Sequence, residues 1–147
     1  MGNSAVVSVQ KLIPASPQQV FDLLADPRQH PLIDGSGTVQ QAQQDAPERL
    51  SLGATFGMDM RMGAPYPITN TVVEFDEPKR IAWHHFGGHV WRYLLEPAPG
   101  GTLVTEQFDY TDARSQLLLR LSGFPGRNKK AMEATLDRLA RHFDEEN

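Results

Sequence analysis

The sequence contains no cysteine, and this absence excludes several kinds of site at once. Without thiols the chain forms neither disulfide bonds nor thiolate metal sites, and it has no cysteine nucleophile. It also lacks any apolar run of about 20 residues, the length that a membrane-spanning helix requires. The sequence does not open with the basic and then apolar layout of a signal peptide. We therefore expect a cytoplasmic protein that does not insert into membranes.

Positive charge is also scarce. The 14 Lys and Arg residues are outnumbered by 18 Asp and Glu residues, which gives a net charge of -4. Proteins that bind nucleic acid usually carry a basic excess or a basic stripe, so nucleic acid is not an expected partner. With 147 residues, of which 39% are hydrophobic and 22% charged, the composition is that of an ordinary globular protein. We expect a single domain over residues 1–147.

What the sequence does contain is a succession of strand patterns. Segments of alternating apolar and polar residues, bounded by glycine, proline and aspartate, predict β-strands. The predicted strands are residues 5–13, 38–43, 55–62, 68–75, 81–86, 90–96 and 102–110. The glutamine-rich segment 38–43 is expected at or near an edge of the sheet. Either face of the segment 68–75 fits the inner position.

Helical patterns follow the first strand and close the chain. Ser16 followed by Pro17 is typical of a helix start, and this short helix ends before Asp26. Residues 28–33 and 117–121 each predict a further helical turn. The long helix is predicted over residues 126–144, where apolar residues recur at helical spacing: Met132, Leu136, Leu139 and Phe143. A run of antiparallel strands followed by one helix predicts an α+β fold with the helix buried on one face of the sheet.

The register of the hairpin in residues 81–96 depends on the length of its loop. A two-residue loop would place Trp83 opposite Arg92 and mix aromatic and charged residues on each face. A three-residue loop, Gly87–His89, instead pairs Trp83 with Tyr93. We predict the longer loop, because it gathers the large side chains on one face. The residues expected on this concave face are Ile81, Trp83, His85, Trp91, Tyr93 and Leu95.

Glu106 is the most informative polar residue, because it lies in phase with Val104 and Phe108 on an otherwise apolar strand face. A buried carboxylate needs a partner or takes up a proton, and its pKa then rises. If Leu95 opposes Val104, the Tyr93 hydroxyl comes within reach of Glu106. Three roles remain open for this carboxyl group: a structural hydrogen bond to Tyr93 or the terminal helix, orientation of a ligand, and general base catalysis.

Six segments carry a resemblance to a known family. They are Pro14–Phe21, Leu24–Pro27, Phe75–Trp83, Trp91–Pro97, Gly100–Glu106 and Met132–Leu139. In this order the sequence resembles the START-like helix-grip (SRPBCC) superfamily, and within it the polyketide cyclase/dehydrase and lipid-transport group. Most of these positions belong to turns and to the core, so the resemblance indicates the fold and does not indicate a particular reaction.

The resemblance implies an antiparallel sheet of about seven strands curved around the C-terminal helix, with two short helices after the first strand. It also implies that the protein binds or carries a small apolar or amphipathic molecule in a cavity between sheet and helix. Two alternatives remain: a polyketide cyclase or dehydratase that acts in the same cavity, and a regulatory or interaction module whose pocket is closed. We favour the carrier. Its partner would be a hydrophobic or aromatic small molecule, and the protein a monomer or homodimer.

The histidines do not predict a metal site. His84 and His85 are adjacent in a strand and point to opposite faces, so they cannot both bind one ion, and His89 lies in the turn. We expect neither a metal nor another cofactor. The candidate catalytic residues are Glu106, His85 and Tyr93. The expected ligand-binding residues are Met58, Met60, Trp83, His85, Trp91, Tyr93, Glu106, Phe108, Met132 and Leu136.

Overall fold

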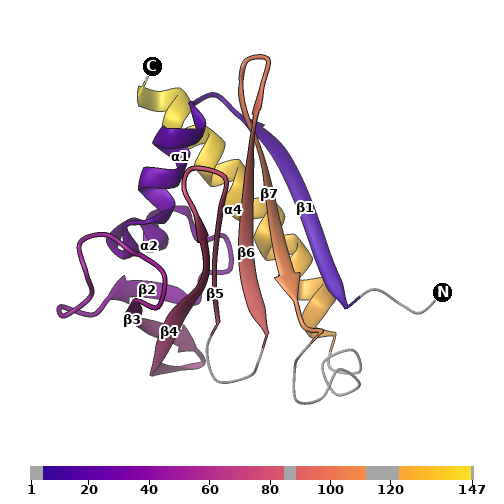
Figure 1. Cartoon of the computed structure of the whole chain (residues 1–147). Helices are drawn as coiled ribbons and strands as arrows, with labels where there is room; N and C mark the ends of the chain where they lie inside the picture. Colours follow the sequence, from indigo (N-terminus) through magenta and orange to yellow (C-terminus); the bar gives the residue numbers. More distant parts are fainter. Residues whose placement is uncertain (1–4, 85–88, 112–122, 147) are drawn as a thin grey trace.

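The computed structural model describes residues 5–84, 89–111 and 123–146 (Figure 1). Its strands are β1 (Val6–Ile13), β2 (Val39–Ala42), β3 (Thr55–Met62), β4 (Ala64–Asp76), β5 (Arg80–His84), β6 (Val90–Ala98) and β7 (Gly101–Asp109). Its helices are α1 (Pro17–Leu24), the 3₁₀ turn η1 (Pro27–Gln29), α2 (His30–Ile33) and α4 (Phe124–Glu146). The predicted turn at residues 117–121 lies outside the described residues. None of the helices in the described residues has the length and apolar character needed to cross a membrane.

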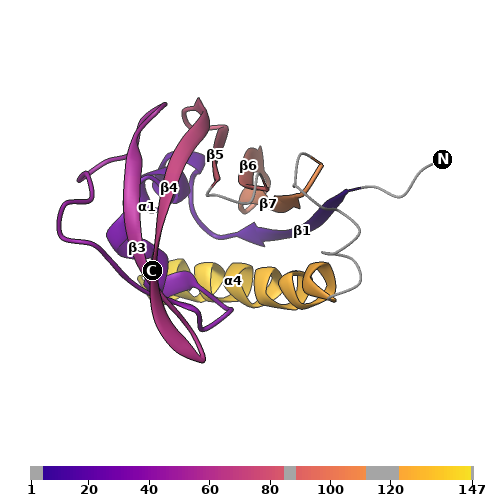
Figure 2. The same ribbon diagram turned by 90° about the horizontal axis from the view of Figure 1, so that it is seen from below.

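The seven strands form an antiparallel sheet in the order β1-β7-β6-β5-β4-β3-β2. This confirms the predicted α+β helix-grip fold and the edge position of the glutamine-rich strand β2. Figure 2 shows α4 lying along the concave side of the curved sheet, with β1 at one side and β3 and β4 at the other. The inner face of the sheet and the buried face of α4 therefore enclose the interior.

The first helix begins where the sequence predicts it. Ser16 Oγ accepts a hydrogen bond from the backbone N–H of Gln19 at 3.2 Å, and Gln19 Oε1 accepts one from the backbone N–H of Ser16 at 2.9 Å. These reciprocal bonds form a capping box that satisfies free donors at the helix start. The apolar face of α1 is buried, and Phe21 meets Phe75 of β4 edge to face at 5.2 Å. The helix thus covers one end of the interior.

The C-terminal helix turns the predicted face toward the sheet. The four residues that set its spacing are all buried: Met132, Leu136, Leu139 and Phe143. An ion pair of 3.2 Å between Lys11 of β1 and Asp137 joins the helix to the sheet edge. The loop after α2 also holds α4, because the backbone N–H of Gly35 donates to Thr135 Oγ1 at 2.9 Å. Contacts with β1 and with the loop after α2 therefore both hold α4 in place.

The predicted hairpin register is wrong by two residues. Trp83 pairs with Trp91 and Ile81 with Tyr93, so five residues separate the last pair, His84 and Val90. A shift of two preserves the alternation of faces, and Trp83 and Tyr93 still share the inner face, with ring centroids 5.7 Å apart. The error arose because the grouping of large side chains determines which face is buried but leaves pairings that differ by two residues equivalent. His85 lies outside the described residues.

Strand β4 begins earlier than the sequence predicts, at Ala64 instead of Ile68. The added part contains Pro65 and Pro67, and proline cannot donate a ladder hydrogen bond. The structure explains the difference: among the described residues, β5 pairs with β4 only from Thr71 onward, and only β3 pairs with the first part of β4. In that part the strand is an edge, where proline is tolerated.

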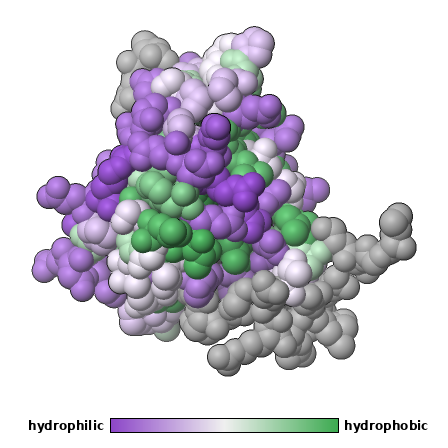
Figure 3. Space-filling view, viewed as in Figure 1, coloured by the Kyte–Doolittle hydropathy of each residue, from purple (hydrophilic) through white to green (hydrophobic). Residues whose placement is uncertain are grey.

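The convex face of the sheet carries charge rather than a second layer. Arg92 of β6 donates three hydrogen bonds to Glu74 of β4, at 2.9, 3.1 and 2.7 Å, and one to Asp109 of β7 at 3.2 Å. The face seen in Figure 3, where the strands lie in front of α4, shows apolar patches between hydrophilic residues. Arg92 thus ties three strands together on the side of the sheet opposite to α4.

The loop contact with α4 generates the first prediction. A Cβ atom at Gly35 would lie 2.5 Å from Ala134 Cβ and 2.6 Å from the carbonyl oxygen of Ala131, both on α4. Gly35→Ala should therefore displace the loop and lower the free energy of unfolding by about 1–3 kcal/mol. Chemical denaturation followed by circular dichroism measures this loss. Gly126→Ala is the control, because its added Cβ would meet nothing within 4 Å; equal effects of the two substitutions would contradict the prediction.

Candidate functional site

The inner face of the central strands carries aromatic side chains around one carboxyl group. On β5 and β6, Trp83 and Tyr93 are buried, 8% and 6% exposed. On β7, Glu106 is 4% exposed and lies between Val104 and Phe108, both fully buried. The alternation predicted from the sequence therefore places Glu106 inside, among apolar neighbours.

Glu106 and Tyr93 lie directly opposite each other in neighbouring strands, and Leu95 opposes Val104 as predicted. Burial raises the pKa of Glu106 to about 8, hydrogen bonding with Tyr93 opposes this shift, and the charge of Asp34 adds to it. The pKa of Tyr93 is raised well above its ordinary value, mainly by burial and then by the charge of Glu106. At neutral pH both side chains are therefore protonated and uncharged.

One oxygen of this carboxyl group is unpaired. Glu106 Oε1 is buried and has no hydrogen-bond partner among the described residues. The interaction with Tyr93 does not satisfy this atom. A buried polar atom without a partner costs about 1–3 kcal/mol, so it marks either a strained position or one that a bound molecule completes.

His30 is a buried residue that the sequence patterns did not indicate as part of the site. Its ring stacks on Trp83 with centroids 4.8 Å apart and an interplanar angle of 17°. Its Nε2 lies 2.8 Å from the carbonyl oxygen of Leu24, and burial lowers the pKa of the ring. A neutral ring that donates from Nε2 fits both observations. No periodicity could reveal it, because η1 and α2 have only 3 and 4 residues.

Asp34, in the loop after α2, is a second residue of the site that the sequence patterns did not indicate. Its carboxylate accepts hydrogen bonds from the Ser36 hydroxyl at 2.7 Å and from the backbone N–H of Val39 at 3.2 Å. Its negative charge raises the pKa of both Glu106 and Tyr93. The loop after α2 therefore contributes to the electrostatics of the interior.

The remaining candidates line the same interior. Met58 of β3 is buried and Met60 is half-buried, both against the core. Trp91 is half-buried and its ring centroid lies 4.7 Å from that of Phe108. From α4, Met132 and Leu136 are each 1% exposed. The structure brings nine of the ten expected ligand-binding residues to the inner face or to the buried face of α4; the tenth, His85, lies outside the described residues.

His89 adds a further ring to the aromatic side chains of the inner face. It is half-buried, and its ring centroid lies 5.2 Å from that of Phe108. Burial is the main reason that its pKa is lowered, with a further contribution from His84. The sequence placed His89 in a turn and assigned it no role, yet it adjoins the inner face beside Trp91.

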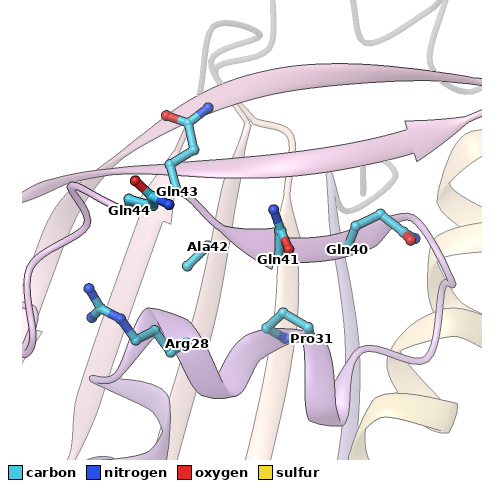
Figure 4. A pocket seen from close by; sticks show the side chains of 7 residues that line it. All are labelled: Arg28, Pro31, Gln40, Gln41, Ala42, Gln43 and Gln44. Carbon is cyan, nitrogen blue, oxygen red and sulfur yellow. The ribbon is translucent and has the colours of Figure 1, made fainter.

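A separate groove lies on the outside, between β2 and the η1–α2 segment (Figure 4). It is lined by Arg28, Pro31, Gln40, Gln41, Ala42, Gln43 and Gln44. Most of its polar groups already serve the fold: Arg28 donates to the carbonyl oxygens of Ala46 and Pro47, and Gln41 donates to Asp59. This groove is therefore a less suitable binding site than the interior.

Comparisons with known proteins agree with this geometry. A family model described as polyketide cyclase / dehydrase and lipid transport matches residues 4–144. The Mycobacterium tuberculosis protein named "Uncharacterized protein Rv0088" is 36% identical over 142 residues, which make up 92% of this chain and 62% of that protein. A second relative, "Uncharacterized protein MT0096" from another M. tuberculosis strain, is 35% identical over the same length. The chain thus spans 62% of the length of these curated relatives.

Solved structures share the fold at low sequence identity. Protein Ms6760 from Mycobacterium smegmatis has a TM-score of 0.75 at 16% identity, with 98% of this chain and 94% of that chain covered. The Polyketide_cyc-like protein Cgl2372 from Corynebacterium glutamicum has a TM-score of 0.61 at 20% identity, with 99% and 95% covered. These likenesses establish the architecture, and the chemistry of the site has to be argued from this chain's own residues.

The raised pKa of Glu106 generates a prediction about stability and pH. The unfolded chain releases this proton near the ordinary pKa of 4.5, whereas the folded protein holds it up to about 8. Between these values the unfolded state binds fewer protons, so Glu106 lowers the free energy of unfolding as pH rises, by at most about 1.4 kcal/mol per pH unit. Above about pH 8 its contribution levels off.

Glu106→Gln removes this titration. The difference in unfolding free energy between the variant and the wild type should therefore grow from about pH 5 to about pH 8 and then stay constant. Urea denaturation at a series of pH values measures it. Glu96→Gln on β6 is the control, because Glu96 is exposed and its replacement should change stability by less than about 0.5 kcal/mol throughout. Parallel pH profiles for wild type and Glu106→Gln would show the prediction to be wrong.

Proposed function

The chain belongs to the polyketide cyclase/dehydrase and lipid-transport family, and from this premise we propose that it binds a small apolar or amphipathic molecule between the inner face of its sheet and α4. The observation that carries this proposal is the unpartnered Oε1 atom of Glu106, buried among aromatic side chains. A ligand polar group at this point would complete the hydrogen bonding of the carboxyl group, while its apolar part contacts the surrounding rings.

The lining supports binding by contact with apolar surfaces. Phe56, Trp83 and His30 meet one another, with Phe56 and Trp83 edge to face at 5.6 Å. Further along the interior, Phe108 contacts Trp91 and Tyr110. Aromatic faces give large contact areas, and the thioethers of Met58 and Met60 adapt to different ligand shapes. Met60 and Trp91 are only half-buried. The exposed part of these two inner-face side chains is surface that a ligand would cover.

Glu106 also supports a second candidate function, catalysis of the cyclase or dehydratase type. A carboxyl group with a pKa of about 8 beside the Tyr93 hydroxyl holds a proton at neutral pH and gives it up slightly above. General acid–base catalysis uses groups whose pKa lies near the working pH. Turnover separates the two functions in Glu106→Gln. Ligand affinity should stay within about threefold of the wild type in either case. An enzyme should in addition lose roughly a hundredfold or more in turnover.

Nile red, an uncharged apolar dye, tests the proposed binding. Its emission should rise and saturate as protein is added, and emission of Trp83 and Trp91 should be quenched in the same range. Dye at about 100 times its Kd should raise the Tm by about 5–10 °C, because a ligand bound only to the folded state stabilises it by about 2.7 kcal/mol. Fluorescence titration and thermal denaturation provide both measurements.

The position of the dye is tested with a matched pair of variants. Met60→Trp adds bulk on the half-buried inner face of β3 and should weaken dye binding by about tenfold. Arg61→Trp adds the same side chain next to it, on the exposed face, and should leave the affinity within about twofold. Absence of saturable dye binding in the wild type, or equal weakening by both variants, would refute the proposed site.

A further inference from the structure

The charge distribution points to the chemical class of the ligand. We infer that the interior site selects an uncharged molecule that presents a hydrogen-bond acceptor oxygen, such as a ketone or ester carbonyl, to Glu106, and that it discriminates against carboxylates. This inference rests on the proposed function, and it names the kind of molecule that the same site accepts.

The first argument is that the described residues place no counter-charge for an anion in the interior. Within residues 5–84, 89–111 and 123–146, every lysine and arginine is exposed except Arg92. Arg92 lies on the convex face, where it pairs with Glu74 and Asp109. Burial lowers the pKa of His30 and of His89, so neither ring supplies positive charge at neutral pH. Burying a carboxylate without a cation is strongly unfavourable.

The second argument is that a negative charge, that of Asp34, acts on the site. Asp34 lies close enough to raise the pKa of both Glu106 and Tyr93. Its carboxylate is held in place by the Ser36 and Val39 donors and by the attachment of Gly35 to Thr135. A ligand carboxylate beside Glu106 would be repelled by this fixed charge, whereas a neutral ligand would not.

The third argument concerns hydrogen-bond direction. A protonated carboxyl group donates one hydrogen bond, and Glu106 Oε1 is buried without a partner among the described residues. Asn128 Nδ2, which can only donate, is the other such atom in the described part of the chain. Asn128 lies one helical turn before the buried Met132, on the face of α4 that meets the sheet. The unpartnered Oε1, as the protonated oxygen of Glu106, is a donor that matches an acceptor oxygen of a ligand, and Asn128 Nδ2 is a second unused donor, on α4.

Three naphthalene derivatives, substituted at the same ring position, test the inference: methyl naphthyl ketone, ethylnaphthalene and naphthoate. Their Kd values at neutral pH are measured by displacement of Nile red. The ketone should bind about tenfold tighter than the ethyl compound, which has the same ring and carbon chain but lacks the acceptor oxygen. Naphthoate should bind at least about tenfold more weakly than the ketone, because it would enter as an anion.

Variants assign the preference to Glu106. In Glu106→Met, which removes the donor, the ratio of ketone to ethylnaphthalene affinity should fall to about one. Glu106→Gln retains an N–H donor and should keep most of the preference. Thr105→Val, one residue away on the outward side of β7, is the control and should leave the ratio unchanged. Because the ratio compares two ligands on one variant, a partial loss of folded protein does not alter it.

The outcomes separate the inference from the proposed function. Naphthoate that binds as tightly as the ketone, or a ketone preference that persists in Glu106→Met, overturns the inference while ligand binding in the interior stands. Binding of none of the three compounds, together with absence of Nile red binding, refutes the proposed function and the inference with it. If Glu106→Met does not fold, the wild-type ratios and Glu106→Gln decide the question.

Discussion

The burial of one carboxyl group between the sheet and α4 is the constraint on which the electrostatics of the interior depend. Glu106 stands on the inner face of β7, and the described cations of the protein lie elsewhere. Desolvation therefore keeps the group protonated and raises its pKa to about 8. Tyr93 on the neighbouring strand faces the same low-dielectric surroundings and is likewise uncharged at neutral pH. The site is polar without carrying charge.

One short segment outside the sheet, α2 and the loop that follows it, maintains this state. The segment after α2 places Asp34 near Glu106, and the close approach of Gly35 to Ala131 and Ala134 fixes that segment on α4. The same segment follows His30, whose ring stacks on Trp83. Packing of the helix and electrostatics of the interior are thus coupled, because one short loop contributes to both. Residues far apart in the sequence, such as Gly35 and Thr135, share a single hydrogen bond.

Much of the candidate site could be predicted, because strand alternation determines which side chains share a face. Glu106 was expected inside from its phase with Val104 and Phe108, and the pairing of Tyr93 with Glu106 followed from a plausible register between β6 and β7. Prediction was weaker where the deciding contact lies in another element. The β5–β6 register, the early start of β4 and the place of His30 each depend on which neighbours are present, and local patterns do not contain that information.

The sequence by itself determined the order of the elements, the buried face of α4 and the inner faces of the strands, except for the segment 68–75, whose two faces it left equivalent. These properties are local, since they follow from side-chain periodicity along a strand or helix. Only the tertiary structure decided that Asp34 lies close enough to Glu106 to shift its pKa, that His30 packs on Trp83, and that Glu106 Oε1 remains without a partner. Those properties depend on distances between separate segments, which are set by the curvature of the sheet and the packing of α4.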